Sequence, residues 1–317
     1  MRLKQAFRMG FLAITLGCTT ISVSFALHAA LAAPVPASEA VYSQFQIYWK
    51  NAHSSSSSLI QARKYLTNHI KEVSPWQATL MTLQLENVQN IKLGNMDEKI
   101  YADPVQRALS DAHSKIGYEQ KLTYSRLLKE IKDPSIRSLL LKTSDLGFKL
   151  ETSEGIYYPI INYEVYKKFQ PYVKADIAAY IDIMADESNQ TTTSDAAISV
   201  SWDELIRRTL EKEAFLTNFP NSNRASAIQN SLIVHYIFYG SDNSPAYDWY
   251  TDEEIRTLDP EVKKAYENAV NTRDDNTKSL LLDTIERILE LLNQNDDELT
   301  PQIQKIIESV EDQFANS

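Results

Sequence analysis

Cysteine and glycine are the residues that this sequence most clearly lacks. It has one cysteine, Cys18, among 317 residues, and only seven glycines. A single cysteine cannot form a disulfide within the chain, so the fold must be held together by its hydrophobic core. About 285 residues follow the apolar N-terminal stretch, and chains of that length bury roughly three quarters of their unfolded surface. β-rich proteins usually need more glycine for their turns, so the scarcity of glycine favours helices.

The common signatures of catalytic, metal and nucleotide sites are also missing. The sequence has no HExxH, CxxC or GxSxG motif and no glycine-rich phosphate loop. His69 and Glu72 have a spacing that suits two metal ligands, but this spacing is common by chance. The segment from Asp242 to Glu253 has acids at several positions of a calcium loop, yet Tyr247 stands where such a loop requires glycine. We therefore predict no metal site and no cofactor.

Charge is distributed unevenly along the chain. The net charge is −10, and residues 240–317 hold 19 acidic and 7 basic side chains. This excess of acids argues against binding to nucleic acid and against adsorption to anionic lipid, because both need basic surface. It is compatible with a cation or a basic partner, although a solvated surface that aids solubility is the simpler interpretation.

The first 32 residues have the pattern of a signal peptide. Arg2, Lys4 and Arg8 precede a long apolar stretch, and Ala30-Leu31-Ala32 has the small residues of a cleavage site. The stretch is also long enough for an uncleaved membrane anchor, and lipid attachment at Cys18 is a third alternative. We predict cleavage near Ala32 and a secreted or envelope-associated protein.

Most of the remaining chain has the signals of helices. Capping residues stand directly before proline at several places, and apolar residues recur every three or four positions. In one such stripe, which includes Ile228, Leu232 and Tyr239, we interpret His235 as a core histidine. We predict an all-α fold of about a dozen antiparallel helices, the last two being 274–293 and 301–314. The predicted cap–proline pairs and capping boxes are Ser74-Pro75, Asp103-Pro104, Asp133-Pro134, Asp259-Pro260, Thr300-Pro301, Ser201–Glu204 and Thr251–Glu254.

The composition of the chain predicts two helical regions. Residues 33–187 form an N-terminal region, and residues 202–317 form an acidic C-terminal region. The Thr- and Ser-rich stretch 188–201 lacks a helical stripe and is predicted to be a loop or linker. One continuous domain over residues 40–317 is the alternative.

One short segment, residues 147–161, has the period of strands. Apolar and polar residues alternate over 148–153, Ser153-Glu154-Gly155 favours a turn, and an apolar arm follows. A β-hairpin is therefore expected here. Tyrosines crowd the same region and either fill the core or form an exposed binding surface, since adjacent strand residues point to opposite faces. The tyrosines that we predict to bind a partner are Tyr157, Tyr158, Tyr163 and Tyr166.

Paired carboxylates support the remaining enzymatic hypothesis. Glu151 and Glu154 flank the hairpin turn, and Glu187 ends a predicted helix. The stretch Ile183 to Ser188 resembles the helix end that holds the catalytic Glu-Ser of lytic transglycosylases and goose-type lysozymes. The Gly-Leu-Met-Gln stretch expected downstream is missing, which puts the substrate cleft in doubt. A glycan hydrolase would need two of these carboxyl groups about 5–10 Å apart in an open groove.

A wider resemblance covers Gly147 to Tyr163, GFKLETSEGIYYPIINY. This segment, with its context from Ser135 to Glu187, is similar to uncharacterised secreted proteins and lipoproteins of Gram-positive spore-formers such as bacilli. The resemblance implies export and no particular activity. Together these features predict an exported, non-enzymatic envelope or extracellular protein that binds a protein or glycan partner. A cell-wall glycan hydrolase is the alternative, and contact with the membrane is expected only if the signal is retained or Cys18 is lipidated.

Overall fold

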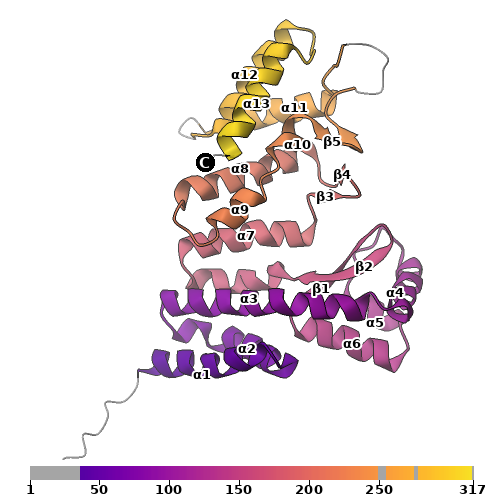
Figure 1. The fold of residues 1–317 in the computed structure, drawn as a ribbon, viewed down its shortest axis with the longest axis vertical. Coiled ribbons are helices and arrows are strands. Elements are labelled where there is room, and N and C mark those ends of the chain that lie inside the picture. Colours follow the sequence, from indigo (N-terminus) through magenta and orange to yellow (C-terminus); the bar gives the residue numbers. More distant parts are fainter. Residues whose placement is uncertain (1–35, 249–254, 275–277, 316–317) are drawn as a thin grey trace, which may run out of the picture. The chain divides into compact units, whose positions relative to one another are not determined.

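The first three helices pack against one another in the part of the chain drawn in indigo and violet in Figure 1. The computed structural model describes residues 36–248, 255–274 and 278–315. The elements here are α1 (Ala37–Ala52), α2 (Ser56–His69), the 3-10 turn η1 (Ile70–Glu72) and α3 (Pro75–Ile100). Helix α3 begins where Ser74-Pro75 predicts. Ser74 Oγ accepts from the Gln77 amide and Gln77 Oε1 accepts from the Ser74 amide, which completes a capping box.

Three shorter helices surround a second core. They are α4 (Asp103–Ile116), α5 (Tyr124–Glu130) and α6 (Pro134–Asp145). Asp133 caps α6 as predicted, because its Oδ1 accepts from the amides of Ser135 and Ile136. Asp103, in contrast, lies inside the first turn of α4 and Ala102 is the N-cap, so that boundary is one residue off the prediction. The buried core residues include Leu109, Leu127, Leu140, Leu150 and Tyr157.

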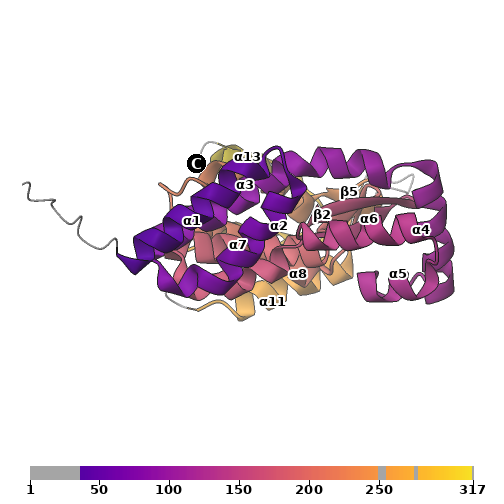
Figure 2. The ribbon, with the colours of Figure 1, turned by 90° about the horizontal axis from the view of Figure 1, so that it is seen from below.

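The predicted hairpin is present. Strands β1 (Phe148–Ser153) and β2 (Ile156–Ile161) pair antiparallel, with Phe148 opposite Ile161 and Ser153 opposite Ile156. Glu154 and Gly155 both have positive φ, 50° and 76°, as a two-residue turn matched to the strand twist requires. Strand β2 contacts α3, and β1 contacts α6, so the hairpin lies among the helices (Figures 1 and 2).

The stretch that we expected to be a loop or linker contains a second hairpin. The 3-10 helix η2 (Tyr163–Tyr172) leads into α7 (Ala175–Asn189), and β3 (Thr193–Ser194) then pairs with β4 (Ala197–Ile198). Asp195 and Ala196 form its turn, with φ of 52° and 56°. Thr193 and Ile198, which pair across this hairpin, are β-branched and therefore favour extended backbone.

Six further helices and a third hairpin form the C-terminal part. They are α8 (Trp202–Asn218), α9 (Ala225–Asn230), α10 (Val234–Phe238), β5 (Gly240–Ser241), β6 (Ser244–Pro245), α11 (Pro260–Asn271), α12 (Leu280–Gln294) and α13 (Pro301–Ala315). Five of these helices share one apolar core, and α12 packs against α13 as predicted, whereas Ile228 of α9 belongs to the core formed with the N-terminal helices. Helix α12 begins at Leu280, capped by Ser279, which is later than the predicted start at residue 274. The capping box predicted at 251–254 lies outside the described residues.

The tips of the three hairpins are joined by hydrogen bonds. Ser153 Oγ donates to Asp195 Oδ1 at 2.6 Å, linking the first hairpin to the second. The Asn243 amide donates to Ala196 O at 3.0 Å, linking the third to the second. Each turn begins with serine followed by an acid, at Ser153-Glu154, Ser194-Asp195 and Ser241-Asp242.

The prediction of an all-α fold is confirmed. The described residues form thirteen α-helices, and their strands form three two-stranded antiparallel sheets. Residues 36–317 group as one compact unit. Within the described ranges, no helix is both long and apolar enough to cross a membrane. The predicted signal peptide, residues 1–32, lies outside those ranges.

Candidate functional site

Three of the four tyrosines predicted to bind a partner are core residues. Tyr157, Tyr163 and Tyr166 have relative exposures of 2%, 6% and 2%. The Tyr163 hydroxyl donates to Glu86 Oε1 at 2.6 Å, and the Tyr157 hydroxyl lies 3.0 Å from His113 Nδ1. Burial raises the pKa of all three phenols, so they stay neutral. They therefore cannot form the exposed aromatic surface that the sequence suggested.

Tyr158 is the one member of the set that is partly exposed. It stands opposite Glu151 on the hairpin, and its neighbour Tyr157 points the other way, as the alternation of a strand requires. Burial raises the pKa of Tyr158, and the nearby Glu151 carboxylate raises it further. A single half-buried ring offers little area for contact with a partner, so Tyr158 alone does not form a binding surface.

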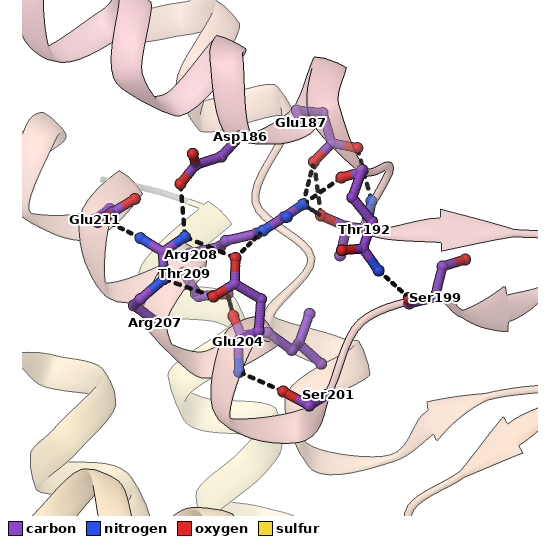
Figure 3. Close-up of polar contacts among 12 residues, drawn as sticks. Asp186, Glu187, Thr192, Ser199, Ser201, Glu204, Arg207, Arg208, Thr209 and Glu211 are labelled. Atoms are coloured by element: carbon purple, nitrogen blue, oxygen red, sulfur yellow. Dashed lines mark hydrogen bonds and ion pairs between the residues drawn. The ribbon is translucent and has the colours of Figure 1, made fainter. Parts of the chain in front are cut away.

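The three candidate catalytic carboxylates have separate surroundings. Glu154 is exposed in the hairpin turn and makes no hydrogen bond or ion pair with the described residues, and Glu151 accepts only from the adjacent Thr152 amide. Glu187 accepts from the Thr192 amide at 2.9 Å and the Thr192 hydroxyl at 2.6 Å (Figure 3). Arg208 Nη1 lies 3.5 Å from the same carboxylate. Glu187 thus stabilises the segment that follows α7 through its hydrogen bonds with Thr192.

The ion-pair network around Glu187 joins α7 to α8. Arg207 contacts Asp186, Glu204 and Glu211, and Arg208 Nε donates to Glu204 Oε1 at 2.7 Å (Figure 3). The hydrogen bonds from Arg207, aided by Arg208, lower the pKa of Glu204 to about 2. Every acid of this network has a basic partner, so the network stabilises the contact between the two helices.

The histidine and acidic motifs weighed as metal ligands lie apart from one another. His69 Nδ1 is 3.0 Å from Glu72 Oε1, and both side chains are largely exposed. In the described residues no three His, Cys, Asp or Glu side chains are arranged to hold a metal ion. Glu253 of the candidate calcium loop lies outside the described residues, and Tyr247, which stands at the position that needs glycine, is buried at 2% exposure.

A surface with two hollows runs along α10. Two adjoining hollows of about 560 and 510 Å³ share His235 and Tyr236 as lining residues. We call this surface the α10 groove. It extends from the β5–β6 turn to α13, and Figure 1 shows α10 beside β5. Its principal side chains are His235, Tyr236, Tyr239, Asp242 and Glu311.

Aromatic rings form one wall of the α10 groove. The His235 ring centroid is 4.9 Å from that of Tyr239 and 6.3 Å from that of Tyr236. His235 is 58% exposed, and its Nδ1 lies 2.9 Å from Glu311 Oε1. The prediction of a buried core histidine was therefore wrong. The helix is interrupted at residues 231–233, between α9 and α10. Residues 228–239 therefore do not form one continuous helix, and the apolar positions before and after the interruption do not share one face.

The charge of the α10 groove is negative. Asp242 and Glu311 line it, and no lysine or arginine is among its described lining residues. Burial raises the pKa of Tyr239, and the carboxylates of Glu311 and Glu308 raise it further. The combination of aromatic faces and carboxylates is the chemistry that holds organic cations.

No protein-family model, curated protein or solved structure matches this chain. The functional assignment therefore depends on the geometry and charge of the surface described above.

Proposed function

We propose that this chain is an exported, non-enzymatic helical protein that binds a basic segment of a partner protein in the α10 groove. The signal-like N-terminus supports export. The observation that carries the binding proposal is the groove itself, where Tyr236, Tyr239 and His235 stand beside the carboxylates of Asp242 and Glu311.

The chemistry of the groove favours a cationic occupant. A lysine or arginine side chain gains from an aromatic face by about 0.5–1 kcal/mol at exposed sites, and a nearby carboxylate adds to that attraction. The surrounding sequence strengthens the attraction for a cation, because residues 240–317 contain 19 acids and 7 bases. Anionic wall polymers and nucleic acids would be repelled by the same field.

The form of the groove favours an extended chain. The two hollows adjoin, and a third of about 520 Å³ shares Gln229, Asn230 and Phe314 with the second. Hollows that follow one another around α9, α10 and α13 suit a peptide better than one compact small molecule. The partner that fits these features is a protein segment containing lysine or arginine at intervals.

Calorimetric titration with synthetic peptides tests the proposal. A peptide of alternating lysine and serine should bind, and a glutamate–serine peptide of equal length should not. Tyr239→Ala should weaken binding about two- to fivefold through loss of the ring. The pair Glu308→Gln and Glu311→Gln should weaken it by a similar factor, and most strongly at low salt.

Matched controls lie outside the groove. Tyr101 is an exposed tyrosine and Glu98 an exposed acid, so Tyr101→Ala and Glu98→Gln should leave peptide affinity unchanged. Equal binding of both peptides, or equal effects of groove and control variants, would contradict the proposal. Tighter binding of an uncharged chitin oligomer than of the lysine peptide would favour a glycan partner instead.

A further inference from the structure

A smaller hollow of about 210 Å³ lies beside the first hairpin, separate from the α10 groove. Strand β1 contributes Lys149 and Leu150 to it, and the segment before and within α5 contributes residues 121–124 and Leu127. Asn162, Glu164 and Asn189 complete its rim. Segments more than 60 residues apart in sequence thus converge on one hollow beside the first hairpin.

Several hydrogen-bond donors around this hollow have no partner. The ammonium groups of Lys121 and Lys149 and the side-chain amide of Asn162 make no hydrogen bond or ion pair with the described residues. The Tyr124 hydroxyl is shielded from solvent and also lacks a partner. Burial lowers the pKa of Lys149, and the neighbouring Lys121 lowers it further, while Glu151 and Glu164 act in the opposite direction. An anion placed in the hollow would give the two ammonium groups and the Asn162 amide a hydrogen-bond partner.

The one acid on the rim is already engaged. Glu164 Oε2 accepts from Asn189 Nδ2 at 2.7 Å and lies 3.5 Å from Lys167 Nζ. Glu164 therefore has a basic partner in Lys167, and the charged side chains that line the hollow are two lysines, Lys121 and Lys149, and this one acid. Two lysines at one hollow stand out in a chain of net charge −10.

Apolar side chains form the remaining wall. Leu122 is partly exposed and Leu150 is 4% exposed, and both pack against the core that contains the fully buried Leu127. A doubly charged, strongly hydrated anion such as phosphate would leave this wall unused. A carboxylate with a short branched tail would place its charge near the lysines and its tail against the leucines, within the available volume.

We propose that this hollow binds a small aliphatic carboxylate, with Lys149 and Lys121 facing the carboxylate and Leu122 and Leu150 facing the tail. This site is independent of the α10 groove, so an experiment that excludes binding at one of them leaves the other proposal standing. Two sources share this chemistry: a free branched-chain acid and the C-terminal residue of a peptide.

Titration calorimetry of the full chain with isovalerate provides the test. Isovalerate should bind, whereas isoamyl alcohol, which has the same tail without the charge, should not. Inorganic phosphate should bind more weakly than isovalerate. N-acetyl-leucine, a mimic of a peptide C-terminus, distinguishes the sources: if it binds more tightly than isovalerate, the peptide source is favoured, and if it does not, the free acid is favoured.

Variants locate the site. Lys149→Met keeps the aliphatic stem and should weaken isovalerate binding about tenfold, the loss expected for one charge-assisted hydrogen bond. Lys142→Met removes an exposed lysine of α6 that does not line the hollow and should change nothing. Lys121→Met provides a second charge deletion in a loop, should Lys149→Met prove misfolded by circular dichroism. No binding of isovalerate, equal binding of the alcohol, tighter binding of phosphate, or unchanged affinity in folded Lys149→Met and Lys121→Met would each overturn the inference.

Discussion

Replacing Arg224 with methionine should destabilise the fold more than any other single loss of a basic side chain described above. Arg224 precedes α9, and its Nη2 donates to Glu86 Oε2 on α3 at 2.6 Å. Glu86 is 3% exposed and also accepts from the Tyr163 and Tyr180 hydroxyls at 2.6 and 2.5 Å. This cluster ties the N-terminal helices to the C-terminal part across 138 residues of sequence. Without Arg224, a buried carboxylate keeps its two phenol donors but loses its counterion.

The magnitude follows from burial. Breaking a buried ion pair by removing one partner costs about 3–5 kcal/mol, because the remaining charge is uncompensated. The two phenol donors offset part of that cost, so we expect about 3 kcal/mol. Arg207 offers the comparison: it contacts three carboxylates, but its side chain is 42% exposed. Exposed pairs contribute about 0.2–1 kcal/mol each, so Arg207→Met should cost less despite breaking more bonds.

Urea unfolding followed by far-UV circular dichroism measures these differences. The double variant Glu86→Gln with Arg224→Met is decisive, because it removes the uncompensated charge and keeps an acceptor for the phenols. It should be more stable than Arg224→Met alone. A cost for Arg224→Met no larger than that of Arg207→Met, or no recovery in the double variant, would refute the reasoning from burial.

Three further outcomes are expected. Gly240→Ala should cost about 2–3 kcal/mol in urea unfolding, since φ is +76° and the new Cβ would lie 2.2 Å from Ser244 O; Gly94→Ala in α3, where nothing lies within 4 Å, should be neutral or stabilising. Glu204 has a lowered pKa of about 2, so its contribution is present above its ordinary pKa and is lost as pH falls from about 4.5 toward 2. In the Glu204→Gln variant, the free energy of unfolding should therefore fall less between about pH 4.5 and 2 than in the wild type, by about 1–2 kcal/mol after allowance for the partial exposure of Glu204. An equal fall in both proteins would contradict this. Mass spectrometry of the exported protein should find an N-terminus just after Ala32 or Ala33; an acylated Cys18 or an intact Met1 would show that the signal is processed differently or not at all.

Local chemistry explains which parts of the fold were predictable. A capping side chain acts on amides two or three residues away, so Ser74, Asp133 and Ser201 marked the starts of α3, α6 and α8 from sequence alone. The first hairpin was predictable for the same reason, since its register and its Glu154-Gly155 turn are fixed within fourteen residues. The second hairpin was missed because two-residue strands offer no alternation to detect.

Long-range partners explain what was not predictable. Strand period correctly places Tyr157 and Tyr158 on opposite faces, but it cannot say which tyrosines of the cluster will be covered. Tyr163 is buried because Glu86, 77 residues earlier, offers its hydroxyl an acceptor inside the core. A phenol with such an acceptor can be buried without an unsatisfied donor, so a cluster of tyrosines predicts a core as readily as a surface.

The α10 groove depends on two structural features that the helical pattern of the sequence does not indicate. The first is the break at 231–233, which turns His235 outward, and the second is the approach of α13, which places Glu311 2.9 Å from the His235 ring. A continuous helix over 228–239 would have kept His235 on the apolar stripe and left Glu311 facing solvent. Asn230-Ser231 followed by β-branched Ile233 and Val234 is the local signal for that break, because these residues disfavour the helix interior. The break that interrupts the helix is therefore what brings an aromatic wall and a carboxylate together in one groove.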